Sequence, residues 1–150
     1  MVQEIRNITL PRRIVATYDN QQFYCLQSTN VINQRAGESE RWPIKYLLGL
    51  LNSRAINFYF RQRFSGNNHI ASNQLAQIPI PQPDPARQAR VVALVELRLA
   101  LSHRHATAKS QRLKTQLENE MGMTDEQLDA LVYELYGLSD DDIQLVEAQA

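Results

Sequence analysis

The chain has 150 residues, enough for one domain with an appendage or for one elongated domain. Its hydrophobic content of 43% supports a buried core. A membrane span is excluded, because Glu96 and Arg98 interrupt the best apolar run.

The net charge of zero conceals an asymmetry between the two ends of the chain. Residues 1–114 carry all 16 Lys and Arg and six acidic residues, whereas residues 115–150 carry no Lys or Arg and the other ten acids. A basic body is typical of proteins that bind phosphate groups. Alternatively, the acidic tail packs on the basic body and neutralises it.

The cysteine content and the N-terminus both indicate a cytoplasmic protein. Cys25 is the single cysteine and lies in an aromatic run, which predicts a buried, reduced thiol. Residues 1–10 contain Glu4 and Arg6 among isolated apolar residues, so no signal peptide is expected.

The first third of the chain has strand-like patterning. Residues 13–18 are β-branched and aromatic, residues 19–22 suit a tight turn, and residues 23–26 predict a second strand, so a hairpin is expected. Residues 29–33 suggest a third strand, and residues 34–41 form a polar, charged loop.

Two helical segments should follow the loop. Pro43 opens the first, whose apolar residues recur at helical spacing, and Asn52-Ser53 breaks or bends the pattern. The second ends near Phe64. Arg61 and Arg63 in its last turn suit the helix dipole.

Residues 66–85 combine a polar turn, a short helical turn and a strap in which Ile78 and Ile80 alternate with proline. Proline cannot donate a ladder hydrogen bond, so the strap is an edge strand or an extended segment. Asp84 followed by Pro85 predicts the cap and first position of a helix.

A long helix is predicted from Pro85 to about residue 121, on the order of 50 Å in length. Its apolar stripe weakens between His103 and Arg112, where a break is allowed. Gly122 should end this helix, and residues 124–127 resemble a capping box for the next one.

The C-terminal segment then predicts a helical hairpin. Gly137 suits a left-handed helix end, and Ser139 with the acids at 140–142 caps a final helix. The expected fold class is α+β, with a small N-terminal antiparallel β region and packed helices. Three regions are expected: a recognition region at 1–83, a long helix at 84–121 and a helical hairpin at 122–150.

Motifs for catalysis or metal binding are not found in the sequence. His103 and His105 are two residues apart on a predicted helix, so they point away from each other. His69 has no Cys, Asp or Glu at ligand spacing, and helix capping explains the acids at 140–142 better than a cation site does. There is no phosphate-binding glycine loop and no nucleophile elbow, so we expect neither catalysis nor a cofactor in this chain.

The order of motifs resembles that of a known family. These motifs are RIVATYD at 13–19, FYCL at 23–26, YLLGLLNSR at 46–54, FY at 58–59, GNNHI at 66–70, QLAQIPIP at 74–81, and LVYELYGLS at 131–139 with IQLVE at 143–147. They resemble the TaqI-like C-terminal specificity domain of type II restriction-modification enzymes, in which an adenine-N6 methyltransferase carries its own DNA-reading domain. The motifs are also similar to those of the target-recognition repeats in type I specificity subunits.

The resemblance implies sequence-specific recognition of duplex DNA as part of a larger enzyme. The Asn-Pro-Pro-Tyr type of motif used for methyl transfer is absent from the chain, as is a nuclease motif. S-adenosylmethionine is therefore implied only for the parent enzyme. The expected partners are double-stranded DNA and a methyltransferase region of the same or a partner chain.

Cations and forked amides in the predicted loops are the candidate DNA contacts, because duplex recognition needs both groups. Each has a structural alternative: a turn residue at Asn20, left-handed backbone at Asn67 and Asn68, a structural role for His69, a helix cap at Asn73. The aromatic residues at 18, 23, 24 and 58–60 are expected in the core. The candidates are Arg12, Arg13, Asn20, Gln21, Gln22, Arg35, Arg41, Asn67, Asn68, His69 and Asn73.

A different function class stays open. The long helix and the acidic hairpin could form a protein-interaction module, which docks another subunit or associates with itself, or part of a type I-like specificity subunit. A small hydrolase has the least support, because no catalytic set is visible.

Overall fold

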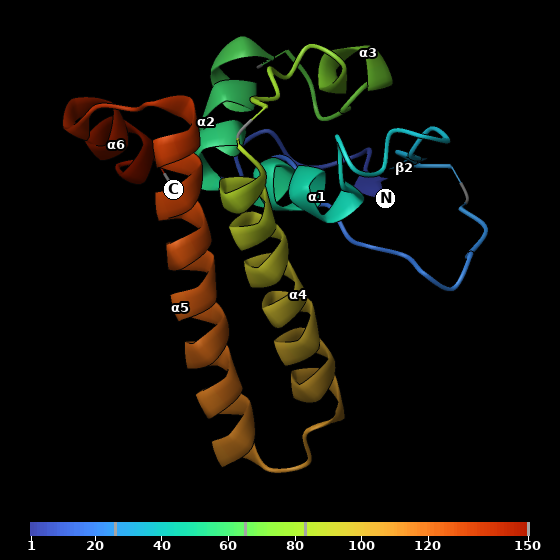
Figure 1. Cartoon of the computed structure of the whole chain (residues 1–150), viewed down its shortest axis with the longest axis vertical. Coiled ribbons are helices and arrows are strands. Elements are labelled where there is room, and N and C mark those ends of the chain that lie inside the picture. The colour runs from blue at the N-terminus through green and yellow to red at the C-terminus, as the bar shows by residue number, and fades with distance from the viewer. Residues whose placement is uncertain (26, 65, 83, 150) are drawn as a thin grey trace.

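The computed structural model describes residues 1–25, 27–64, 66–82 and 84–149. These residues form a compact body from which a long two-helix arm projects (Figure 1). The two strands of the described part are β1 (Val2–Gln3) and β2 (Thr29–Asn30). Its helices are α1 (Ile44–Asn52), α2 (Arg54–Arg63), α3 (Ser72–Leu75), α4 (Pro85–Thr107), α5 (Gln111–Tyr136) and α6 (Asp140–Glu147). The expected α+β class is confirmed.

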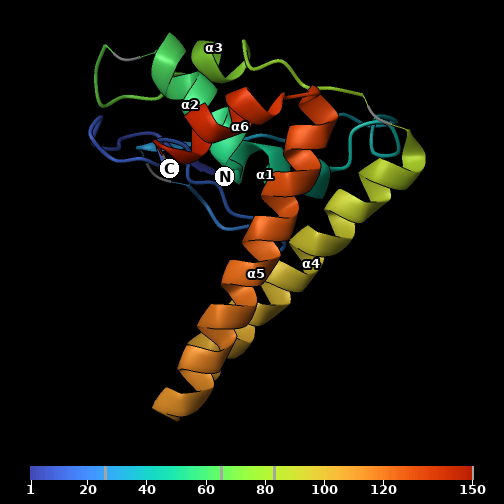
Figure 2. The same ribbon diagram turned by 90° about the vertical axis from the view of Figure 1, so that its left-hand side faces the viewer.

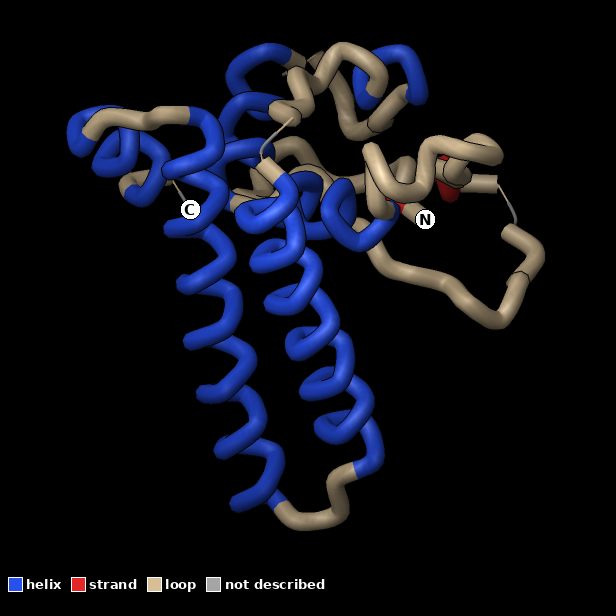
Figure 3. The backbone as a smooth tube through the Cα atoms, in the orientation of Figure 1, coloured by secondary structure: helices blue, strands red, loops and turns tan. Residues whose placement is uncertain are grey.

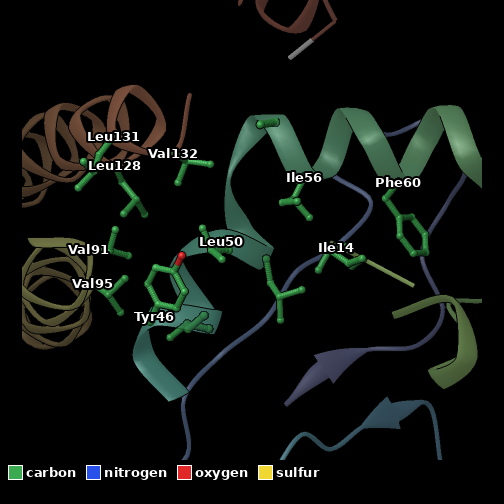
Figure 4. Packing of buried hydrophobic residues seen from close by; sticks show 14 of the residues in the cluster. Ile14, Tyr46, Leu50, Ile56, Phe60, Val91, Val95, Leu128, Leu131 and Val132 are labelled. Atoms are coloured by element: carbon green, nitrogen blue, oxygen red, sulfur yellow. The ribbon is translucent and has the colours of Figure 1, made fainter. Parts of the chain in front are cut away.

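Helix α1 lies at the centre of the core, between the arm and the N-terminal segment (Figure 4). Its Tyr46 and Leu50 are fully buried. Gly49 lets α4 approach closely, since a Cβ at this position would lie only 2.9 Å from Val95 Cγ2 and 3.0 Å from Val91 Cγ1. This contact joins the body to the arm.

The predicted N-terminal hairpin is wrong. Residues 13–17 instead run beside the N-terminus, with Gln3 N 3.0 Å from Val15 O and Thr17 N 2.9 Å from Met1 O. Residues 23–25 belong to no strand, and residue 26 lies outside the described residues. Asp19 redirects the chain by accepting from the Gln21 and Phe23 N–H groups, which makes an open loop rather than a tight turn.

Side-chain amides replace the missing strand partner. Asn57 Oδ1 accepts from Ile14 N at 2.7 Å, and Asn52 Oδ1 accepts from Ala16 N at 2.9 Å. Of the predicted third strand, only β2 forms, and it pairs antiparallel with β1. The sheet is therefore small because helices α1 and α2 supply hydrogen bonds that a second long strand would otherwise provide.

The predicted long helix ends earlier than residue 121. Helix α4 stops at Thr107, inside the region where a break was allowed, and the Ser110 Oγ caps α5 by accepting from Leu113 N. Gly122 is not a helix end, and Thr124 is not a cap, because Thr124 Oγ1 donates to Glu120 O inside the helix. The buried face of α5 continues through Gly122 and sustains the helix, so that α4 and α5 form an antiparallel pair.

Several local signals are confirmed. Ser53 separates α1 from α2 and caps α2, and Asp84 caps α4 by accepting from Arg87 N at 3.0 Å. Gly137 is left-handed with φ 63°, and the Leu138 N–H donates to Tyr133 O. Ser139 forms the predicted cap of α6.

The Ile-Pro segment forms an extended strap rather than a strand. Tyr46 Oη donates to Pro81 O at 2.8 Å, and Tyr136 Oη donates to Pro79 O at 2.6 Å. Burial raises the pKa of Tyr46 to about 12, so its hydroxyl stays a donor. The strap thus ties α1 to the end of α5.

Helices α4 and α5 project from the body side by side, and a short turn joins them at the end far from the body, as two perpendicular views show (Figures 1 and 2). Leu101 and Leu117 are buried between the helices, and Arg98 Nε lies 2.9 Å from Asp125 Oδ1. None of the described helices has the length and apolarity needed to cross a membrane.

Candidate nucleic-acid interface

Long loops cover much of the body outside the helices, and they carry all the predicted site residues except Asn73 (Figure 3). Loops suit a recognition surface because their side chains project freely while the helices beneath hold their ends. The predicted residues fall into several separate groups.

The first group lies where the N-terminal segment meets the loop at 66–69. Arg6 N donates to Asn68 O at 2.9 Å, and Ile8 N donates to Asn68 Oδ1 at 2.9 Å. Asn67 Oδ1 accepts from His69 N at 2.8 Å and so shapes the loop itself. The side chains of Asn67, Asn68 and His69 are nevertheless exposed. We call Arg6, Arg12, Asn67, Asn68 and His69 the N-terminal cluster.

Arg13 belongs to this region but is buried, with an exposed fraction of 1%. Its Nη2 donates to Asn67 O at 3.0 Å, whereas Nε and Nη1 have no partner among the described residues. Burial and the nearby charges of Arg6 and Arg61 lower the pKa of Arg13. Arg13 therefore positions the loop from beneath, and its side chain is not available to a duplex in this structure.

The second group is the loop at residues 18–25. Asn20, Gln21 and Gln22 are exposed there, and Gln22 has a left-handed backbone with φ 57°. The expectation of buried aromatic residues is correct for Phe60, and Phe58 and Tyr59 are half-buried. It is wrong for Tyr18, Phe23 and Tyr24, which are 37%, 65% and 101% exposed. Cys25 is also exposed, which corrects the predicted buried thiol.

An open groove of about 680 Å³ separates this loop from the helical body. Tyr18, Phe23 and Tyr24 line one part of it, and Leu47 and Leu51 of α1 line another. The groove explains why the aromatic side chains are exposed, because the loop arches away from α1 instead of packing on it. An amide-rich tip beside exposed aromatic rings offers both hydrogen bonding and stacking to a base.

The third group is the loop at residues 33–42. Arg35 and Arg41 are exposed, and the Arg41 guanidinium lies 5.6 Å from the centre of the Trp42 ring. Arg41 Nη2 also donates to Gln82 Oε1 at 3.2 Å, which holds this arginine against the strap. Asn73, on the short helix α3, is exposed and outside these three groups.

The acidic tail neutralises only some of the cations. Arg54 lies 2.7 Å from Glu147 Oε2 and 3.4 Å from Asp129 Oδ2, and Arg61 Nη1 donates to Gln149 O. Burial raises the pKa of Asp129, although Arg54 acts in the opposite direction. Thus the alternative that the acidic tail neutralises the basic body holds in part, because the tail pairs with Arg54 of helix α2.

The loop cations, by contrast, keep their charge available. Within the described part of the chain, none of them lies within 4.0 Å of a carboxylate oxygen. They come from two parts of the body, the N-terminal cluster and the loop at residues 33–42, and would meet phosphate groups without first breaking an ion pair. These cations are Arg6, Arg12, Arg35 and Arg41.

A metal or catalytic centre has no support in the described residues. They contain no group of three His, Cys, Asp or Glu side chains that could hold a metal ion. His105 Nε2 lies 3.0 Å from Glu118 Oε1 across the arm, so its neighbour is a carboxylate rather than His103.

Sequence reasoning missed Arg6 and the exposed rings of Phe23 and Tyr24. Arg6 joins the N-terminal cluster through Asn68, which is 62 residues away in the chain, so no local pattern could reveal it. The polar residues at 19–22 weakly indicated that the rings are exposed, because such a run is compatible with an open loop as well as with a hairpin turn.

Comparison with known proteins supports the recognition suggested by the motifs. The family model of the TaqI-like C-terminal specificity domain matches residues 4–80, just over half of the chain. The search of curated proteins gave no match, and the search of solved structures gave none. The matched range runs from the N-terminal segment to the strap and contains every predicted site residue. The chain therefore belongs to the TaqI-like C-terminal specificity domain family.

Proposed function

We propose that this chain recognises a specific sequence in duplex DNA as the specificity domain of a restriction-modification enzyme. Family membership, together with the unpaired loop cations, carries the proposal. Family membership assigns the class of function, and the cations supply the phosphate contacts on which affinity for DNA depends.

Different side chains of the loops contact different parts of the DNA. Arginine guanidinium groups at 6, 12, 35 and 41 hold phosphates and fix the orientation of the duplex. The exposed amides of Asn20, Gln21 and Asn67 suit base edges, since an Asn or Gln amide pairs in a bidentate manner with adenine. Arg13 contributes indirectly by supporting Asn67.

Methyl transfer belongs to another region of the parent enzyme in this proposal. The chain lacks the motif for that reaction, and S-adenosylmethionine would bind to a methyltransferase region of the same or a partner chain. The contribution of this chain is to place the target sequence, and the chain itself is not the catalyst.

A salt titration of DNA binding tests the proposal. The double variant Arg35→Gln with Arg41→Gln should lower affinity for duplex DNA on the order of 10-fold and reduce the salt dependence. The matched control is Arg87→Gln with Arg90→Gln, two exposed cations of α4 outside the family match. It removes the same charge and should leave binding unchanged.

Specificity is tested by a panel of duplexes with different sequences. Replacing Asn20 and Gln21 by Ala should reduce discrimination between the preferred duplex and the others by about 1–3 kcal/mol for each lost bidentate contact. Absence of any salt-sensitive binding to the panel, with the neighbouring methyltransferase region present, would rule the proposed function out.

Exposed apolar residues on the arm favour docking to another chain as a second function. Leu97 of α4 is 48% exposed, and Met123 of α5 is 61% exposed. Light scattering on the chain and on its Leu97→Lys variant tests self-association. A monomer in both cases would exclude it and leave only docking to a different protein.

A further inference from the structure

The closed end of the arm concentrates positive charge. Residues 103–114, which we call the arm tip, contain four Lys and Arg residues and no Asp or Glu. Arg104, Lys109 and Arg112 are exposed, and Lys114 is half-buried. In the part of the chain that the structure describes, none of the four lies within ion-pair distance of a carboxylate.

The acids nearest the arm tip have other partners. Glu118 lies 3.0 Å from His105 Nε2, Glu120 accepts from Gln116 Nε2, and Asp125 pairs with Arg98. The arm therefore stabilises itself by contacts along its shaft and leaves its end charged. Like charges gathered at one end of an elongated element are repulsive by themselves, so an external anion stabilises them.

The small side chains at the turn indicate the kind of anion. Ala106, Thr107, Ala108 and Ser110 lie between the cations in the chain, and residues 103–114 contain no Phe, Trp or Tyr. Interfaces with proteins depend on buried Trp, Tyr and Arg anchors seated in pockets. Cations on an unshielded turn instead suit phosphate groups, whose contacts are electrostatic and need no pocket.

The arm tip stands clear of the body. Lys45 Nζ of the body reaches Glu96 of α4 at 2.6 Å, and Thr107 lies 11 residues further along the helix. At 1.5 Å per residue, the tip extends about 17 Å beyond that contact. The major groove is about 12 Å wide, so a projection of this length is long enough to reach a stretch of backbone beyond the one that the body would hold. Figure 2 shows the arm projecting from the body.

We propose that the arm tip binds the phosphate backbone of the duplex whose sequence the body loops read. The inference rests on the proposed function. It adds a second, sequence-independent contact that enlarges the footprint on DNA and orients the duplex relative to the arm. Short duplexes that fill only the body would lack this contact.

The test compares duplexes of two lengths. The variant Lys109→Gln with Arg112→Gln removes two exposed charges from the arm tip. On a duplex of about three turns, ~30 bp, we expect an affinity loss on the order of 10-fold and a salt slope lower by about 1.8, whatever the sequence. On a duplex of about one turn, ~10 bp, centred on the preferred sequence, binding should be unchanged.

A charge-matched control separates a local contact from an effect of net charge. Gln127→Glu with Gln144→Glu lowers the net charge equally at exposed positions of α5 and α6. It should bind the long duplex as the unmodified chain does. Circular dichroism should confirm unchanged helix content in both variants, since all four positions are exposed.

The remaining outcomes distinguish a failure of this inference from a failure of the proposed function. Unchanged binding of the arm-tip variant to the long duplex overturns the inference. Equal losses in the variant and the control also overturn it. If the unmodified chain prefers no sequence while the arm-tip effect persists, the proposed function fails and the phosphate contact stands. If the unmodified chain binds no duplex, both fail.

Discussion

The loop-covered body and the helical arm use opposite means to stay ordered. In the arm and α6, caps at Asp84, Ser110 and Ser139 close the helices, and Arg98 pairs with Asp125. The N-terminal loops have two-residue strands, exposed rings and cations without carboxylate partners. The difference teaches that ion pairs lie at α2 and along the shaft of the arm, whereas the cations of the loops and of the arm tip have no carboxylate within 4.0 Å among the described residues.

The loops are nevertheless anchored, through few but buried polar contacts. Asn57 and Asn52 reach from the helices to the backbone of residues 14–16, and both also bond helix carbonyls. Polar groups buried in this way must find partners, so each amide fixes the register of the segment it holds. The comparison therefore predicts that single buried contacts matter more in the body than in the arm.

The largest effect is expected at Asn57. In the variant Asn57→Leu, Ile14 N loses its acceptor and Leu51 O loses a donor in a buried site. We expect the free energy of unfolding to fall by about 3–5 kcal/mol in urea denaturation. The exposed control Asn73→Leu should change it by less than about 0.5 kcal/mol. Similar values for the two variants would contradict the anchoring role of Asn57.

The contact between body and arm gives the next effect. A Cβ in Gly49→Ala would press on Val91 and Val95 of α4, and overpacking of this kind costs about 1–3 kcal/mol. Gly122→Ala, at an exposed position inside α5, should raise stability by about 0.5–1 kcal/mol. Thermal unfolding of the two variants should shift in opposite directions. A stabilised Gly49→Ala would show that α4 moves away from α1 at little cost.

A smaller effect of opposite sign is expected at Arg13. Its guanidinium is buried with two unpartnered nitrogens, and burial lowers its pKa. Replacing a buried, incompletely paired ion by an apolar side chain of similar volume often stabilises, so Arg13→Met should raise the free energy of unfolding by about 1 kcal/mol. DNA affinity should fall only slightly, because Arg13 acts through its hydrogen bond to Asn67 O and not through a contact of its own with the duplex. A loss as large as that of the Arg35→Gln with Arg41→Gln variant, without a loss of stability, would instead show that Arg13 reaches the duplex.

The smallest effect is a pH dependence at the C-terminal helix. Burial disfavours the Glu147 carboxylate, but hydrogen bonds from Tyr133 and Arg54 outweigh it and lower the pKa of Glu147 below 4.5. Stability from this group is present above pH 4.5 and is lost as the pH falls through the lowered value. Because Glu147 is partly exposed, we expect less than about 1 kcal/mol.

The variant Glu147→Gln isolates this contribution. Its unfolding free energy should match that of the unmodified chain at low pH and fall below it at neutral pH. A difference that stays constant from pH 3 to pH 7 would exclude titration of Glu147 as the cause.

Prediction from the sequence succeeded where the signal was local. Caps and glycine ends depend on neighbours within a turn, which explains the correct positions of Asp84, Gly137 and Ser139. It failed at Gly122, because the burial of one face of α5, against α4 in this part of the helix, outweighs the low helix propensity of one glycine. For the candidate site, the sequence predicted that the residues lie in loops, but it did not predict which of them lie close together in space.

The sequence by itself determined the family, the helical segments of the body, the strap and the concentration of basic residues before residue 115. Only the tertiary structure decided that Arg13 is buried, that Asn57 replaces a strand, and that Tyr24 is exposed. These outcomes depend on contacts between residues far apart in the chain, such as Ile14 with Asn57 and Arg54 with Glu147. Composition and spacing report the propensity of a segment, whereas burial and charge pairing depend on which distant segment packs against it.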